Sequence, residues 1–335
     1  MPEVKLASGR GFECAQGLTI LEAATQGKIP IPYSCKTGRC STCKCKVISG
    51  ETKVLVAELG LTESEKIEGW ILSCARTATS DVVLEVEDLG GVVIPPVKTQ
   101  ACRISILEKL AADVIKVVLR LPPAVTFNFI PGQYIDVIGP GGVRRSYSLA
   151  NAPKTDNTLE LHIRAVENGA MSHYWFNQAA VNDLLRLHGP QGTFFMRNLA
   201  QRALIFLATG TGIAPVKAML EALPGLSAEQ MPQSVTVFWG ARYSHDLYFD
   251  VSALPGPHRY IPVLSRETVW QGERGYIQDV LLRDKSDLSN CSVYACGSDA
   301  MINSAKDALT SAGLPSQYFY SDAFVCSGTL VLVKT

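Results

Sequence analysis

Apolar and polar positions alternate in the first part of the chain, and this alternation predicts half-buried strands. Residues 82–86 form one such segment, and residues 4–14 suggest a hairpin. Thr19 and Glu22 have the spacing of a capping box, which predicts a short helix between these strands. Residues 1–92 are therefore expected to fold as one small unit with both strands and helices.

The pattern then changes twice. From about residue 102, short strands such as 114–121 are separated by Pro/Gly turns, which favours a small antiparallel barrel. After about residue 200, continuous apolar strands such as 203–208 alternate with helical segments such as 216–223. This alternation predicts a doubly wound α/β sheet of parallel strands.

A linker separates the first unit from the rest of the chain. Glycines are paired at 90–91 and prolines at 95–96, in a stretch with little charge. We therefore expect a multidomain protein. Its segments are residues 1–92, a linker at 93–100, residues 101–198 and residues 199–335.

The composition narrows the class of protein. Of the 335 residues, 47% are apolar and 19% are charged, as in folded soluble proteins. The net charge of zero argues against a nucleic-acid-binding protein that relies on a basic field. No apolar run predicts a membrane span, and the N-terminus lacks a signal-peptide core, so we expect a cytoplasmic protein. The expected oligomeric state is a monomer.

Three cysteines have the spacing C-x4-C-x2-C, and a fourth follows some thirty residues later. They are Cys35, Cys40, Cys43 and Cys74. This spacing is typical of a plant-type [2Fe–2S] site, which needs four thiolate ligands. A zinc site, which usually pairs two C-x2-C units, and ordinary buried thiols are the alternatives. Cys45 is predicted to be a spare thiol.

A second motif lies in the predicted barrel, at Arg145, Ser146, Tyr147 and Ser148. An arginine, an aromatic ring and a hydroxyl at alternate positions of one strand are expected to project to the same face. Such a face could present a guanidinium to a phosphate and a ring to a flat heterocycle. Taken alone, the pattern is also typical of a half-exposed strand.

A third motif follows the first apolar strand of the α/β segment. Gly210, Thr211, Gly212 and Pro215 open a helix, where backbone N–H groups and the helix N-terminus could hold a diphosphate. A tight turn between a strand and a helix is the alternative interpretation. Pro215 departs from the G-x-G-x-x-G pattern of dinucleotide-binding domains.

Together these motifs resemble the ferredoxin–NADP reductase-like superfamily, preceded by a plant-type ferredoxin domain of the β-grasp fold. The barrel segment matches the family's R-x-Y-S motif, and residues 210–215 match its G-T-G-x-A-P motif. The resemblance implies three cofactors: a [2Fe–2S] cluster, FAD and NADH. FAD is expected over FMN because relatives with an N-terminal ferredoxin domain generally carry FAD.

The resemblance also implies further cofactor-binding residues. For FAD they are His162, Ile163, Arg164, Gly169, Met171, Ser172, Gly189, Gly192 and Thr193. For the nicotinamide nucleotide they are Gly240, Arg242, Ser265, Arg266, Cys296, Gly297 and Met301. Ser148 and Cys296 are expected to position the two reacting rings, and Phe324 to cover the flavin as a further catalytic residue.

The function that the resemblance implies is a reductase that passes electrons from NADH through FAD and the cluster to a partner protein. Two groups share this domain order: CDP-6-deoxy-Δ3,4-glucoseen reductases, which serve a pyridoxamine-dependent sugar dehydratase, and reductase components of bacterial oxygenases. Segments 145–153, 188–195 and 319–325 look closer to the first group, and segment 39–46 to the second. We favour the sugar-pathway reductase. A non-enzymatic electron carrier is the alternative from another class.

Some features remain open. Arg242 could meet the 2′-phosphate of NADPH, and the tail 326–335 has no interpretation. Ser41 replaces a glycine that most members of both groups have. Basic side chains beside the cluster loop are either a docking rim for the partner protein or a solvated surface. They are Lys36, Arg39, Lys44 and Lys46.

Overall fold

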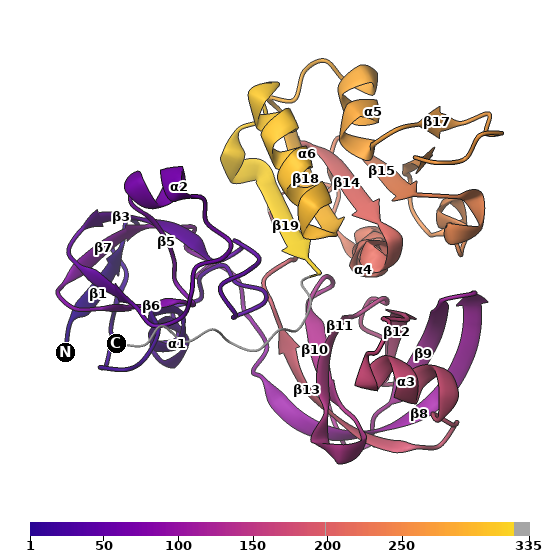
Figure 1. Ribbon diagram of the computed structural model, residues 1–335, viewed down its shortest axis with the longest axis horizontal. Coiled ribbons are helices and arrows are strands. Elements are labelled where there is room, and N and C mark those ends of the chain that lie inside the picture. Colours follow the sequence, from indigo (N-terminus) through magenta and orange to yellow (C-terminus); the bar gives the residue numbers. More distant parts are fainter. Residues whose placement is uncertain (198, 325–335) are drawn as a thin grey trace. The chain divides into compact units, whose positions relative to one another are not determined.

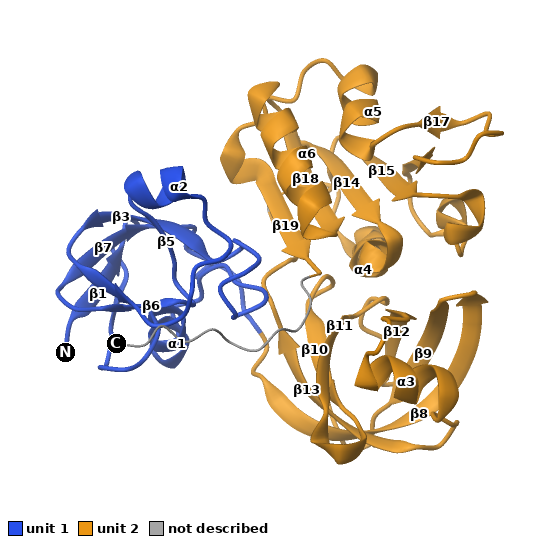
Figure 2. Cartoon of the chain, viewed as in Figure 1, with its two compact units in different colours: residues 1–94, 325–335 blue, residues 95–324 orange. Residues whose placement is uncertain are grey.

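The computed structural model describes residues 1–197 and 199–324. These residues fall into two compact units, Met1–Ile94 and Pro95–Phe324, which Figure 2 shows in different colours and which are described separately here. Among the described residues, no helix is long and apolar enough to cross a membrane.

The first unit is a five-stranded mixed sheet in the order β2-β1-β7-β3-β5, with a separate pair β4-β6 (Figure 1). Its strands are β1 (Glu3–Leu6), β2 (Gly11–Glu13), β3 (Lys44–Ser49), β4 (Thr52–Val54), β5 (Trp70–Leu72), β6 (Arg76–Ala78) and β7 (Val82–Glu85). Its helices are α1 (Ile20–Gln26) and α2 (Glu63–Ile67). Both begin at a capping box, at Thr19 and at Thr62. The alternating side chains of β1 share one core with the apolar face of α1, and the predicted β-grasp fold is confirmed.

The second unit begins with a six-stranded antiparallel sheet in the order β11-β10-β13-β8-β9-β12. Its elements are β8 (Lys98–Ala111), β9 (Val114–Arg120), β10 (Tyr134–Ile138), η1 (Pro140–Gly142), β11 (Arg144–Ser148), β12 (Thr158–Arg164), α3 (Ala170–Asn177) and β13 (Leu184–Gln191). Just after β11, the backbone N–H of Ala150 donates to the carbonyl oxygen of Glu160 in β12 at 2.8 Å. The two edge strands of this curved sheet therefore meet there.

The rest of the second unit is a parallel sheet in the order β17-β16-β15-β14-β18-β19. Its strands are β14 (Ala203–Thr209), β15 (Ser234–Ala241), β16 (Arg259–Leu264), β17 (Glu273–Arg274), β18 (Cys291–Gly297) and β19 (Phe319–Ala323). Its α-helices are α4 (Ile213–Ala222), α5 (Ile277–Asp284) and α6 (Asp299–Ser311). Its 3-10 turns are η2 (Gly210–Gly212), η3 (Leu223–Gly225), η4 (Ser244–Asp246), η5 (Val251–Ala253) and η6 (Ser316–Tyr318). The predicted doubly wound sheet is confirmed.

Strand order fixes where a ligand fits in this sheet. The chain runs outward from β14 to β17 and then returns to β18 on the other side of β14. In open α/β sheets, ligands bind at such a switch point, outside the carboxyl ends of the strands. Helix α4 begins at Ile213, three residues before the predicted start at 216, and includes Pro215 in its first turn. The ring is tolerated there because first-turn N–H groups have no intrahelical acceptor.

Candidate functional site

The four cysteines predicted as cluster ligands form two thiol pairs in the first unit. The sulfur atoms of Cys43 and Cys74 are 3.2 Å apart, and the backbone N–H of Cys35 donates to the sulfur of Cys40 at 3.4 Å. A hydrogen bond from the Cys40 thiol lowers the pKa of Cys35 to about 5. A hydrogen bond from Cys43 likewise lowers the pKa of Cys74. Each pair therefore already contains one group inclined to be a thiolate.

This pairing fits the iron–sulfur interpretation. Two pairs of thiols suit two metal centres with two thiolates each, the donor set of a [2Fe–2S] cluster. These four residues would hold the cluster, which supplies one-electron chemistry when bound.

The backbone of the cluster loop is tightly constrained. Gly38 has φ 74°, and a Cβ there would lie 2.3 Å from the carbonyl oxygen of Ala57. Ser41, at the position where a glycine is usual, has φ 58°, and its hydroxyl donates to the carbonyl oxygen of Gly60. Left-handed backbone at a non-glycine residue costs about 1–2 kcal/mol, which the side-chain hydrogen bond offsets in part.

Two residues beside the cluster loop, Cys45 and Lys44, have different surroundings. Cys45 is completely buried, and burial raises the pKa of its thiol to about 12, as expected for a spare thiol rather than a ligand. Lys44 lies 2.5 Å from the carboxylate of Glu65 and above the ring of Trp70. Its charge is therefore neutralised within the first unit, which weakens its place in the predicted docking rim.

The flavin motif occupies β11, and its side chains divide between the two faces of the strand. Tyr147 packs on the barrel core, and its hydroxyl accepts a hydrogen bond from the indole of Trp175 at 3.0 Å. Ser146 points the other way and donates to Asp136 at 2.6 Å. Strand alternation places Arg145 with Tyr147 and places Ser148 with Ser146. The expectation that all three groups share one face was wrong, because Ser148 is one residue from Tyr147, not two.

The glycine-led turn predicted to lie under the flavin diphosphate forms the start of α3. Gly169 precedes the helix, and the hydroxyl of Ser172 accepts from the N–H of Val166 at 2.9 Å, which fixes the turn. Met171 is buried in the barrel core. The first-turn N–H groups of α3 lack intrahelical acceptors and could bind an anionic group.

The G-P-x-G segment at the end of β13 has a packing role. A Cβ at Gly189 would lie 2.8 Å from the Ile135 side chain, and one at Gly192 would lie 2.8 Å from the ring of Tyr134. The two glycines therefore allow this segment to pack closely against β10. The neighbouring Thr193 is buried. Contact of this segment with FAD stays a prediction.

The predicted flavin residues of β12 have other partners. The Nε2 atom of His162 lies 2.8 Å from the carboxylate of Glu160, and its Nδ1 atom lies 3.1 Å from the hydroxyl of Tyr248. Both ring nitrogens are thus used within the protein, which leaves only the backbone of His162 for FAD. Ile163 is buried in the barrel core. Arg164 lies 3.1 Å from Asp113, and its guanidinium is 2.8 Å from where a Cβ at Gly210 would be.

The predicted nicotinamide site lies at the switch point, where the loops that follow β14 and β18 approach each other. A Cβ at Gly212 would lie 2.2 Å from the carbonyl oxygen of Cys296, and one at Gly297 would lie 2.1 Å from the hydroxyl of Thr209. The N–H of Phe324 donates to the carbonyl oxygen of Gly297 at 2.8 Å. Close approach of two loops thus explains why both positions are glycine.

Cys296 is enclosed by the protein, and its role beside the nicotinamide stays a prediction. Its side chain is completely buried in the core beside β14, and burial raises the pKa of its thiol well above the usual value. Phe324, in contrast, is 41% exposed at the end of β19. Met301 lies in the first turn of α6, where its N–H donates to the capping hydroxyl of Ser298 at 3.3 Å. Gly297 is buried as well, so the ring of Phe324 is the accessible group of this set.

The residues predicted to hold the adenosine end come together beside this site. The N–H of Arg266 donates to the carbonyl oxygen of Arg242 at 3.0 Å, and the hydroxyl of Ser265 donates to that of Ala241 at 3.2 Å. Arg242, Ser265 and Arg266 are exposed. Gly240 permits close packing on α5, since a Cβ there would lie 2.9 Å from Ile277. Two guanidinium groups thus stand at the carboxyl ends of β15 and β16.

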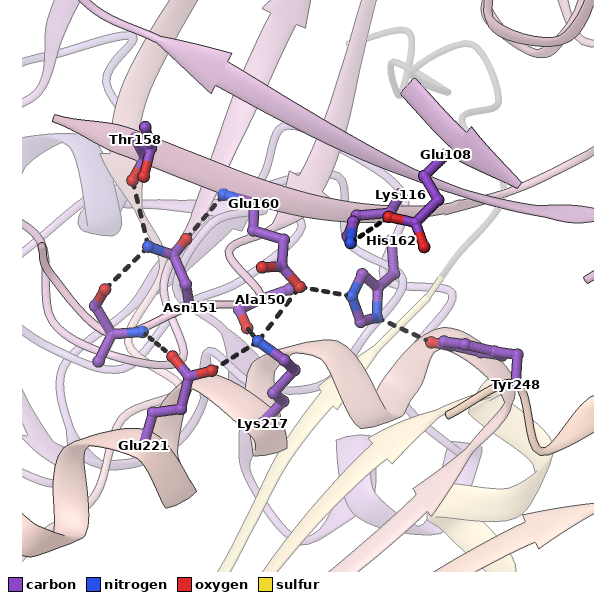
Figure 3. Close-up of polar contacts among 11 residues, drawn as sticks. Glu108, Lys116, Ala150, Asn151, Thr158, Glu160, His162, Lys217, Glu221 and Tyr248 are labelled. Atoms are coloured by element: carbon purple, nitrogen blue, oxygen red, sulfur yellow. Dashed lines mark hydrogen bonds and ion pairs between the residues drawn. The ribbon is translucent and has the colours of Figure 1, made fainter. Parts of the chain in front are cut away.

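A polar network that no sequence motif predicted lies between the barrel and the α/β part of the second unit (Figure 3). Its members are Ala150, Asn151, Ala152, Glu160, His162, Lys217, Glu221 and Tyr248. The i,i+4 spacing of Lys217 and Glu221 was its only local signal, and that spacing is common on solvated helices.

Three protein-family models match the chain in order. They are a 2Fe-2S iron-sulfur cluster binding domain at residues 4–79, an oxidoreductase FAD-binding domain at residues 101–196 and an oxidoreductase NAD-binding domain at residues 206–307. The three predicted cofactors are thereby confirmed at the level of the domains.

Relatives and solved structures cover nearly the whole chain. A CDP-6-deoxy-L-threo-D-glycero-4-hexulose-3-dehydrase reductase of Yersinia pestis is 42% identical over 92% of this chain and 94% of its own. The electron transfer component of a xylene/toluene monooxygenase of Pseudomonas putida is 32% identical over 94% and 92%. Among solved structures, an Amycolatopsis cytochrome P450 reductase is 29% identical with a TM-score of 0.74, covering 97% of this chain and 99% of its own.

Proposed function

Because the chain belongs to the family of iron–sulfur flavoprotein reductases that carry these three domains in this order, we propose that it reduces a pyridoxamine-dependent dehydratase acting on a CDP-linked deoxyhexulose. The observation that carries this choice is the 42% identity to the Yersinia pestis dehydrase reductase, against 32% for the monooxygenase component. Both matches span more than nine-tenths of the chain, so the difference is not one of coverage.

Separate groups of residues serve the three cofactors of this oxidoreductase. The loop Gly210–Gly212 and the N-terminus of α4 offer N–H groups to the nucleotide diphosphate. The backbone beside Ser148 and the first turn of α3 border the proposed flavin site, and the two thiol pairs hold the cluster. When bound, FAD takes two electrons as a hydride and the cluster passes electrons singly.

The cluster is expected to pass its electrons to a separate acceptor protein. The two-electron donor and the one-electron cluster require the flavin as converter, and a protein acceptor then collects the electrons. The family relatives named as components for dehydrases or oxygenases support a protein acceptor. Resemblance of segment 39–46 to oxygenase reductases makes an oxygenase component the second candidate.

Reconstitution with both acceptors tests the choice. The purified chain is mixed anaerobically with NADH and either a CDP-6-deoxyhexulose dehydratase with its substrate or an oxygenase component. We expect rapid deoxysugar formation in the first mixture. The Cys40→Ser variant serves as the control, because it should reduce ferricyanide through FAD but not the dehydratase. Turnover only with the oxygenase would overturn the proposal.

A further inference from the structure

Residues 150–152, which follow strand β11, are hydrogen-bonded to helix α4, which begins at the nucleotide loop. Lys217 of α4 donates from Nζ to the carbonyl oxygen of Ala150 at 3.0 Å, and Glu221 accepts from the N–H of Ala152 at 3.0 Å. Lys217 and Glu221 also pair with each other at 2.6 Å (Figure 3). One turn of α4 thus binds the backbone of this segment at two points, two and four residues after Ser148.

Strand β12 holds the same segment from its other side. Asn151 is completely buried, accepts from the N–H of Glu160 at 2.7 Å and donates to the carbonyl oxygen of Thr158 at 3.1 Å. The carboxylate of Glu160 also lies 3.1 Å from the Lys217 ammonium. The Lys217 ammonium therefore contacts two carboxylates and one carbonyl oxygen. These contacts join α4, β12 and residues 150–152.

The network continues to the loop after β15. Burial lowers the pKa of His162, so the imidazole is neutral, donates from Nε2 to Glu160 and accepts at Nδ1 from Tyr248. Burial also raises the pKa of Tyr248, which keeps its hydroxyl a donor. In this chain of contacts, Tyr248 therefore donates to His162, and His162 donates to Glu160.

Two ends of this network lie near the predicted nucleotide loop and the end of the flavin strand. Lys217 is four residues after Ile213, the first residue of α4, which is about 6 Å along the helix axis. On the other side, Ala150 is two residues from Ser148. A shift of α4 against residues 150–152 would change the distance between the nucleotide loop and the flavin strand.

We propose that Lys217 and Glu221 are positioning residues, a clamp that sets the nucleotide loop against the end of the flavin strand for hydride transfer. This inference rests on the reductase function but not on the identity of the protein acceptor. Displacement of reacting atoms by about 1 Å can cost a hundredfold in rate, so a clamp of this kind would act on the chemical step. Binding of either cofactor alone would depend on it much less.

The test compares Lys217→Met with Lys66→Met. Lys66 also pairs with a glutamate, Glu63, at 2.7 Å, but on helix α2 of the first unit. Stopped-flow reduction of the bound flavin at saturating NADH should be slowed about 10- to 100-fold in Lys217→Met. The dissociation constants for FAD and NADH should stay near those of the wild type, the control should be unaffected, and Lys217→Arg should recover part of the rate.

A second measurement needs no cofactor. In the FAD-free protein, Glu221→Leu should speed hydrogen exchange at the Ala152 amide, since that amide donates to the Glu221 carboxylate and leucine has no acceptor. Equal flavin reduction rates in Lys217→Met and Lys66→Met, or unchanged exchange at Ala152 in Glu221→Leu, would overturn the clamp. A loss confined to the FAD dissociation constant would also overturn it. Absence of NADH-driven ferricyanide reduction in the wild type would instead reject the reductase function.

Discussion

Gly212 and Cys296 lie so close that a Cβ on the first would be 2.2 Å from the carbonyl oxygen of the second. The loop after β14 therefore rests directly on the end of β18, and the contact has no space for a side chain. Gly212→Ala should force the two loops apart, with a loss of about 1–3 kcal/mol of stability and a raised KM for NADH.

Gly225→Ala provides the matched control for this substitution. Gly225 lies in η3 of the same sheet domain, and a Cβ there would have no atom within 4 Å. Thermal unfolding and steady-state kinetics should show a defect only in Gly212→Ala. Similar behaviour of the two variants would mean that the loop contact does not shape the nucleotide site.

The thiol pairs predict which cysteines the cluster needs. Cys40→Ser should abolish the cluster's visible absorbance and cytochrome c reduction, yet spare ferricyanide reduction, which the flavin performs alone. Cys45→Ala should retain all three, because Cys45 is a buried neutral thiol outside the pairs. Loss of both activities in Cys40→Ser would contradict the proposed electron path.

The backbone conformation and the hydrogen bond of Ser41 predict how substitutions at this position change the stability of the first unit. Ser41→Gly removes the cost of the left-handed backbone and loses the hydrogen bond to Gly60, so the two effects should nearly cancel. Ser41→Ala keeps the backbone cost without the hydrogen bond, and should destabilise the first unit by about 1 kcal/mol. Thermal loss of the cluster's absorbance measures both, and a more stable Ser41→Ala would refute this account.

The Glu160 carboxylate predicts a pH dependence. Burial opposes ionisation, but the hydrogen bond from His162 and the charge of Lys217 outweigh it and lower the pKa of Glu160 from 4.5 to about 2. A lowered pKa means that the folded state binds its proton less readily than the unfolded state does. The resulting stability, at most about 3 kcal/mol, is present above pH 4.5 and is lost as the pH falls toward 2.

Urea unfolding of the wild type and Glu160→Gln from neutral pH downward would measure this effect. The stability difference between them should be constant above pH 4.5 and should shrink as the medium becomes more acidic. Acid-sensitive groups that do not contact Glu160 are common to both proteins, so their contributions cancel; His162 contacts Glu160 and is excluded from this cancellation. A difference that stayed constant down to about pH 3 would show that the Glu160 pKa is not lowered.

Arg242 predicts a difference between the two nicotinamide nucleotides. Its guanidinium is exposed at the carboxyl end of β15, next to Arg266. Because only NADPH carries a 2′-phosphate, Arg242→Ala should raise KM for NADPH more than KM for NADH. Steady-state rates with both nucleotides decide the matter, and an equal change in the two KM values would place Arg242 away from that phosphate.

Local spacing determined much of this protein. The interval between Cys35, Cys40 and Cys43 depends only on a short loop, and the glycines of 210–212 depend only on the strand and helix that flank them. Period-2 and continuous apolar runs likewise predicted the antiparallel and parallel sheets. Such features involve neighbours along the chain, so the sequence alone carries them.

Tertiary structure decided the rest. It pairs Cys43 with Cys74, 31 residues apart, and brings Lys217 to Ala150, 67 residues apart. It also buries Cys296 completely and uses both nitrogens of His162 within the protein. Burial and partner choice come from how sheets and helices pack across long loops, and no local pattern of residues records that packing.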